Sequence, residues 1–145
     1  MARMQGTQAT TAQLAHDLRE TLGRVLRRLR AEPGPPIPQL AVLSRLDREG
    51  PASISDLAAA DRMRPQSMAQ TVRDLEEAGL VFRRPDPQDG RRSFVELTPT
   101  GLETLRALRA RREDWLTRAL ERELDAGELE ALGAALALLR RVADA

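Results

Sequence analysis

The stretch RRPDPQDGRRSFVELT, residues 83–98, places four arginines, two prolines and a glycine before a run of alternating apolar and polar residues. Residues 80–84 and 93–98 read as two short strands, and the Pro, Asp and Gly residues between them are typical of a turn. The segment therefore predicts a β-hairpin with arginines at its tip. Asp89 lies two residues before Arg91, close enough to hydrogen-bond and orient its guanidinium group. Such an orientation would reduce the side-chain entropy that Arg91 loses on binding.

Two short helices joined by a tight turn are predicted directly before the hairpin, and another helix over residues 39–48 precedes them. Ser53, followed three residues later by Asp56, resembles a capping box with Asp in place of the usual Glu or Gln. Pro65 is well placed at the first position of the second short helix, and Gly79 ends it. Such a pair is a common packing unit, so by itself it leaves a helix-turn-helix motif open. The expected inward face of the second short helix consists of Met68, Val72 and Leu75.

The expected outward face of this helix carries side chains that suit DNA bases. Glutamine can bond adenine, and arginine can bond guanine, through two hydrogen bonds each. Between Arg62 and Arg73 there are three arginines and no acid, whereas Asp74, Glu76 and Glu77 lie at the C-terminal end. An ordinary solvated face is the alternative. The outward residues are Gln66, Ser67, Gln70 and Arg73.

A hairpin that directly follows a helix-turn-helix is a wing, and this order favours DNA binding. Arg91 and Arg92 at its tip would reach the minor groove, where negative potential concentrates. A solvated hairpin, whose charges only protect a strand edge from aggregation, is the alternative.

Helices are also predicted at both ends of the chain. Leu14, Leu18 and Leu22 begin an apolar stripe in the first helix, and EPGPPIP, residues 32–38, ends that helix. A long helix is predicted from about residue 99 to residue 123, directly after the hairpin.

The last helix, which begins at Asp125 with Glu128 three residues on, is apolar on nearly all sides. A helix of this kind is usually buried. A terminal helix of a small domain can hardly be covered on both sides by its own chain, so a homodimer is expected. The residues expected at the dimer interface are Leu14, Leu18, Leu129, Leu132, Leu136 and Leu139.

Composition excludes several classes of protein. A chain of 145 residues suits one domain, and a net charge of +1 argues against a nonspecific polycation. With no cysteine and one histidine, thiol redox chemistry is excluded and no metal site is expected. No G-x-S-x-G motif or phosphate loop is present, so neither an enzyme nor a cofactor is expected. Without a secretory signal or an apolar run of about 18 residues, the chain is expected in the cytoplasm, with residues 1–12 as a disordered lead-in.

Residues 40–101 resemble the winged helix-turn-helix core of the MarR family of transcriptional regulators. The most specific parts are LEEAGLV, residues 75–81, which runs into RRPDPQDGRR, and LTPTG, residues 97–101. The flanking helices extend the resemblance over nearly the whole chain.

This resemblance implies a single domain of mainly α fold. A three-helix core and a β-hairpin wing form the winged helix-turn-helix over residues 38–98, flanked by dimerisation helices over 13–37 and 99–145. The resemblance also implies a homodimer that binds double-stranded DNA at a pseudopalindromic operator, usually as a ligand-responsive repressor. A winged domain that binds another protein, without specific DNA binding, is the alternative function.

The resemblance carries over to individual positions. Asp89 and Arg91 match the aspartate and arginine of the family's wing, and Arg64 departs from the family's pattern. Arg64 falls at the expected N-cap, where Ser or Thr is common, and would place a cation near a phosphate. The recognition-helix positions that face DNA are occupied by Gln66, Ser67, Gln70 and Arg73.

The resemblance further implies a pocket for a small aromatic or anionic effector, between the dimerisation helices and the DNA-binding unit. Arg109 and Arg112 fall within the apolar stripe of the long helix and could bind a carboxylate. An interchain ion pair, or snorkelling at the edge of the stripe, is the alternative. Trp115 suits the core or an interface as well as a ligand platform.

Overall fold

A computed structural model of the protein describes residues 9–145. These residues form six helices and one antiparallel hairpin. The chain divides into two compact units, one ending at Glu32 and the other covering Pro33–Ala145. Within residues 9–145, no helix is both long enough and apolar enough to cross a membrane.

The described part of the first unit consists mainly of α1 (Thr11–Arg30). Thr10 caps this helix: its hydroxyl oxygen accepts a hydrogen bond from the Gln13 N–H at 3.2 Å, and the Gln13 side chain accepts one from the Thr10 N–H at 3.0 Å. This capping box starts the helix because it satisfies N–H groups that lack helical partners. The expected disordered lead-in was therefore wrong for Thr11 and Ala12, and its residues 1–8 lie outside the described residues.

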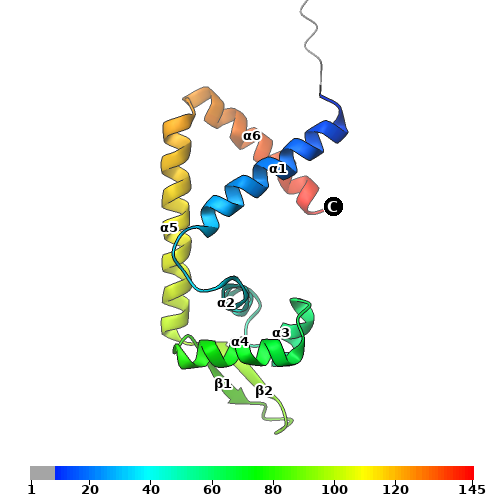
Figure 1. The fold of residues 1–145 in the computed structure, drawn as a ribbon, viewed down its shortest axis with the longest axis vertical. Helices are drawn as coiled ribbons and strands as arrows, with labels where there is room; N and C mark the ends of the chain where they lie inside the picture. Colours follow the sequence, from blue (N-terminus) through cyan, green and yellow to red (C-terminus); the bar gives the residue numbers. More distant parts are fainter. Residues whose placement is uncertain (1–8) are drawn as a thin grey trace, which may run out of the picture. The chain divides into compact units, whose positions relative to one another are not determined.

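The second unit begins with three helices and a β-hairpin, and this order confirms the predicted winged helix-turn-helix (Figure 1). The two strands pair antiparallel, with Val81 opposite Leu97 and Pro85 opposite Ser93. The hairpin and the third of these helices lie together at one end of the unit. The elements are α2 (Ile37–Glu49), α3 (Ile54–Ala60), α4 (Pro65–Glu77), β1 (Val81–Pro85) and β2 (Ser93–Leu97).

The ends of α3 and α4 follow from the local sequence. The Ser53 hydroxyl oxygen accepts a hydrogen bond from the Asp56 N–H at 3.1 Å, so half of the predicted capping box forms. Arg64 is the N-cap of α4 without a side-chain cap bond, and Pro65 follows at the first position, where a missing N–H costs nothing. Gly79 has a φ of 74°, a left-handed conformation that glycine adopts without a Cβ penalty, and it lies just beyond the end of α4.

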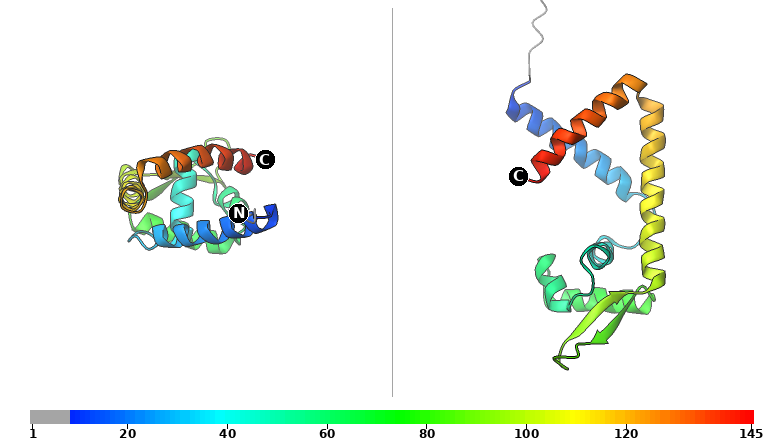
Figure 2. Two further views of the ribbon diagram at one scale, coloured as in Figure 1. Left: turned by 90° about the horizontal axis from the view of Figure 1, so that it is seen from above. Right: turned by 180° about the vertical axis from the view of Figure 1, so that it is seen from behind.

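Two further helices follow the hairpin, α5 (Pro99–Glu123) and α6 (Ala126–Ala143). Asp125 and Glu128, which mark the predicted start of this last helix, form a capping box at the start of α6. Figure 2 shows that α6 follows the end of α5 that lies away from the hairpin. Since no residue of α6 is buried in the single chain, this helix has an uncovered surface.

The junction between the wing and α5 is held by Thr98. Its hydroxyl donates a hydrogen bond to the Gly79 carbonyl oxygen at 2.6 Å and accepts one from the Gly101 N–H at 3.0 Å. The Thr98 N–H donates to the Leu80 carbonyl oxygen at 3.1 Å. These bonds tie the end of α4, the start of β1 and the first turn of α5 together. The LTPTG motif is thus a packing junction.

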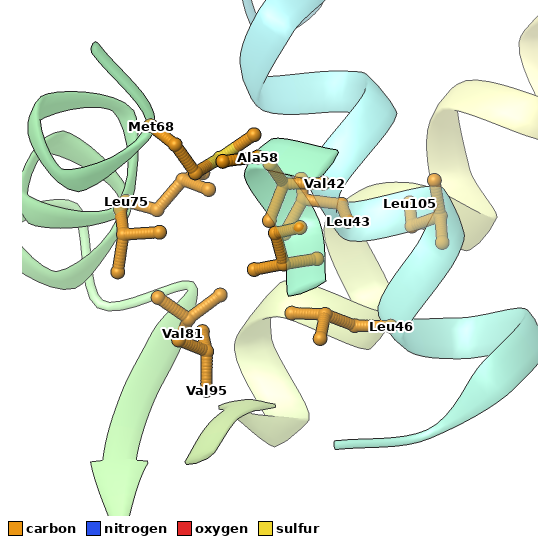
Figure 3. Close-up of a cluster of buried hydrophobic side chains, with 11 residues drawn as sticks. Val42, Leu43, Leu46, Ala58, Met68, Leu75, Val81, Val95 and Leu105 are labelled. Carbon is orange, nitrogen blue, oxygen red and sulfur yellow. The ribbon is translucent and has the colours of Figure 1, made fainter. Parts of the chain in front are cut away.

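One hydrophobic core joins the winged region to the first half of α5 (Figure 3). Met68 and Leu75 enter this core from α4, and Val81 and Val95 enter it from the two strands. Each large apolar side chain removed from water contributes about 1.5–3 kcal/mol. Burial of this face of α4 turns the opposite face toward solvent. The buried residues of the core are Val42, Leu43, Leu46, Leu57, Ala58, Met68, Val72, Leu75, Val81, Val95 and Leu105.

Candidate nucleic-acid interface

The solvent face of α4 presents the four residues expected on the recognition helix. Gln66, Ser67, Gln70 and Arg73 are all exposed, whereas the inward residues of the same helix are buried. The predicted division of α4 into two faces is therefore confirmed. Contact of these four side chains with DNA stays a prediction.

Three residues of this face form a hydrogen-bonded chain. The Arg73 guanidinium donates to the Gln70 side-chain oxygen at 2.8 Å, and the Gln70 amide nitrogen donates to the Asp74 carboxylate at 2.8 Å. Steps of three and four residues bring side chains together on one side of a helix. These two hydrogen bonds therefore follow from helical geometry.

The turn between α3 and α4 is held by an ion pair that sequence reasoning missed. Arg45 of α2 donates to the Asp61 carboxylate at 3.0 Å and to the Glu49 carboxylate at 3.0 Å. The hydrogen bond to Asp61, supported by Glu49, raises the pKa of Arg45. Arg62, which follows Asp61 in this turn, has a backbone φ of 52°, a left-handed conformation that residues other than Gly, Asn or Asp rarely adopt. The ion pair thus connects α2 to the turn from which α4 starts.

The loop of the wing is organised by its backbone. The Asp89 carboxylate accepts a hydrogen bond from the Arg91 backbone N–H at 3.0 Å, so the predicted bond to the Arg91 guanidinium was wrong. Aspartate side chains often accept a hydrogen bond from the backbone N–H two residues later, and this bond stabilises a turn. The Asp89 carbonyl oxygen also accepts from the Arg92 N–H at 3.0 Å. Asp89 therefore shapes the loop, and the Arg91 side chain is not oriented by it.

The four arginines of the wing differ in their surroundings. Arg83 pairs with Glu76, and Arg84 pairs with Glu96 at 2.9 Å. Among the described residues, no acceptor bonds the guanidinium of exposed Arg91. Arg91 is consequently the wing arginine whose charge is most available to a partner.

A hollow of about 240 Å³ lies between the start of α3 and the wing. Arg92 reaches across it and donates to the Ser53 hydroxyl oxygen at 3.2 Å, with the Asp56 carboxylate 3.6 Å away. Three arginines line the hollow, and two of them, Arg83 and Arg92, are paired with the acids Glu76 and Asp56. Its lining residues are Ser53, Ile54, Ser55, Arg83, Arg91, Arg92 and Ser93.

The three residues suggested for an effector pocket all lie on α5 but differ in their surroundings. Arg109 of α5 pairs with Asp47 of α2 at 2.6 Å, a contact within one chain that the sequence did not predict. Its charge is therefore already engaged, which argues against its binding an anionic effector. Arg112 and Trp115 are half-buried on the same helix.

The leucines assigned to a dimer interface remain on the surface of the single chain. In α6, Leu129 is 37% and Leu136 44% exposed, and Leu14 of α1 is 62% exposed. Leu18, Leu132 and Leu139 are half-buried. The described chain leaves these apolar side chains partly uncovered.

Comparison with known proteins connects this geometry to one group of regulators. The sequence profile of the MarR family matches residues 36–93. An HTH-type transcriptional regulator of Mycobacterium bovis is 35% identical over 136 residues, which cover 92% of this chain and 94% of the relative. The crystal structure of a Pseudomonas aeruginosa protein described as a transcriptional regulator is 42% identical, with a TM-score of 0.82 over 93% of this chain and 98% of that one. The PcaV transcriptional regulator of Streptomyces coelicolor, solved with its natural ligand, is 30% identical, with a TM-score of 0.54 over 94% of each chain.

Proposed function

Because the chain belongs to the MarR family of DNA-binding transcriptional regulators, we propose that it binds a pseudopalindromic operator as a homodimer and represses transcription in the cytoplasm. The observation that carries this proposal is the exposed polar face of α4 beside a wing whose Arg91 guanidinium bonds no acceptor among the described residues. The chain acts as a binding protein in this proposal and not as an enzyme.

Each protomer would contact DNA through two elements. Helix α4 would enter the major groove with Gln66, Ser67, Gln70 and Arg73, because an α-helix fits that groove. Arg91 of the wing would reach the minor groove beside it. Arg64, at the N-cap of α4, and Arg92, in the hollow beside α3, would lie near phosphates.

The homodimer would form through the apolar surfaces of the terminal helices. The exposed leucines of α6 support this arrangement, since large apolar patches on a soluble protein mark interaction sites. A twofold axis would place the two α4 helices on half-sites about 10 base pairs apart.

A small aromatic or anionic effector would control operator binding by changing the separation of the two α4 helices. The structure of PcaV with its natural ligand supports control by a bound ligand. Arg112 and Trp115, half-buried on α5, are the proposed contacts for this effector.

Selection of bound duplexes from a random DNA pool at about 0.1 M salt tests the proposed function. The selected duplex should be a pseudopalindrome, and its affinity, measured by fluorescence anisotropy, should fall steeply with salt because several phosphates are neutralised. A purified dimer that selects no sequence, and binds DNA weakly and without preference, would favour the alternative function as an adaptor between proteins.

Replacement of Arg91 by alanine should reduce operator affinity by about 1–3 kcal/mol per wing without changing the dimer. The reason is that the exposed Arg91 guanidinium bonds no acceptor among the described residues, so its full charge is available to the minor groove. Anisotropy titration of the selected duplex measures the loss. Arg84→Ala is the matched control, since Arg84 already pairs with Glu96. Equal affinities for wild type and a dimeric Arg91→Ala protein would refute the wing assignment.

Replacement of Asp89 by alanine should weaken binding less, by about 0.5–1.5 kcal/mol, the usual contribution of one hydrogen bond. The substitution frees the Arg91 backbone N–H and loosens the loop. Asp89→Asn keeps an oxygen acceptor at the same position and should bind nearly as tightly as wild type. An asparagine variant as weak as the alanine variant would show that the carboxylate charge, and not the turn, is what matters.

A further inference from the structure

The amide of Gln70 is held at both ends by charged neighbours on α4. Its oxygen accepts from Arg73 and its nitrogen donates to Asp74, each at 2.8 Å. A guanidinium group can only donate, and an ionised carboxylate can only accept. A flipped amide would therefore set two donors against each other at Arg73 and two acceptors against each other at Asp74. The two charges determine which way the amide points.

This arrangement leaves Gln70 with a defined set of free hydrogen-bonding groups. A primary amide has two N–H donors and two acceptor positions on its oxygen. The hydrogen bonds to Arg73 and Asp74 use one donor and one acceptor of the Gln70 amide. One donor and one acceptor therefore remain free on this exposed side chain. In the major groove adenine presents one acceptor, N7, and one donor, N6–H, whereas guanine presents two acceptors.

We propose that Gln70, oriented by Arg73 and Asp74, reads an adenine at one position of each operator half-site. The free donor of the amide would meet adenine N7, and its free acceptor would meet the N6 amino group. Asp74 is then a residue that determines specificity without touching the base. The inference rests on the proposed function, because it needs α4 to lie in the major groove.

Gln66 provides a contrast within the same helix. It lies four residues earlier on the exposed face, and no side chain among the described residues holds its amide. Its amide can therefore turn to suit different bases. Gln70 should read its position strictly, whereas Gln66 should discriminate less.

The experiment measures affinity for the selected duplex and for variants that carry each base pair at every half-site position. Wild type should prefer adenine at one position by about tenfold or more, and Gln70→Ala should lose that preference alone. Replacing that adenine with 7-deazaadenine, which lacks the N7 acceptor, should weaken wild type but leave Gln70→Ala unaffected.

Asp74→Ala tests the orienting role, with Glu77→Ala as the matched control. Both substitutions remove one negative charge from the same end of α4, so both should change overall affinity similarly. Only Asp74→Ala should reduce the preference for adenine over guanine, because Arg73 alone then orients the amide. Equal base preferences in these two variants would overturn the role of Asp74.

The failures of the two proposals are distinguishable. If wild type selects a pseudopalindrome but Gln70→Ala keeps every base preference, the inference about Gln70 is wrong and the regulator function stands. If wild type selects no sequence at all, both proposals are wrong. Circular dichroism melting should confirm that each variant folds, since Gln70 and Glu77 are exposed.

Discussion

Replacement of Leu136 by aspartate should convert the proposed homodimer into a monomer and lower operator affinity by a factor of about 10²–10⁴, the usual gain from linking two binding modules. Leu136 lies on the apolar stripe of α6 and is 44% exposed in the single chain. In a dimer it would be covered, and an unpaired carboxylate would then be buried at high cost. Light scattering coupled to size exclusion measures the assembly, and anisotropy titration measures the affinity.

Ala137→Asp is the control for this substitution. At roughly 100° per residue, Ala137 falls on the polar side of α6, about 20° from the direction of Glu130 and about 40° from that of Arg141. The same charge there should leave the dimer and operator binding intact. A Leu136→Asp protein that stays dimeric at micromolar concentration would show that α6 is not the interface.

Replacement of Gly101 by alanine should lower the free energy of unfolding by about 3 kcal/mol or more, at the upper end of overpacking effects. Gly101 is buried in the first turn of α5, against the start of β1. An added Cβ would overlap the Leu80 carbonyl oxygen and lie 2.9 Å from the Leu80 carbonyl carbon. Both atoms belong to the backbone, so they cannot move aside as the end of a flexible side chain would. Urea unfolding followed by circular dichroism measures the change.

Gly90→Ala in the wing is the matched control for Gly101→Ala. No heavy atom lies within 4 Å of a Cβ built at Gly90, so its substitution should leave stability nearly unchanged. Similar unfolding midpoints for the two variants would contradict the close packing of α5 against Leu80.

The sequence by itself determined the helices, the hairpin and most of their ends. The spacing of Met68 and Leu75 places them on the inner face of α4, and Pro65 and Gly79 mark where that helix starts and ends. These features depend on residues within a few positions of one another, so the order along the chain is sufficient. The bonds of Gln70 to Arg73 and Asp74 are equally local and follow from the steps of three and four residues.

Only the tertiary structure decided which side chains the arginines pair with. Arg92 meets Ser53, 39 positions away, and Arg109 meets Asp47, 62 positions away. Such pairs exist because the core packs distant elements against one another, and no local pattern encodes which charges then face each other. The sequence places Arg91 and Arg92 at the tip of the hairpin but does not show which wing arginines find acidic or hydroxyl partners. Packing engages Arg83, Arg84 and Arg92 with neighbouring side chains and, among the described residues, leaves the guanidinium of Arg91 without one.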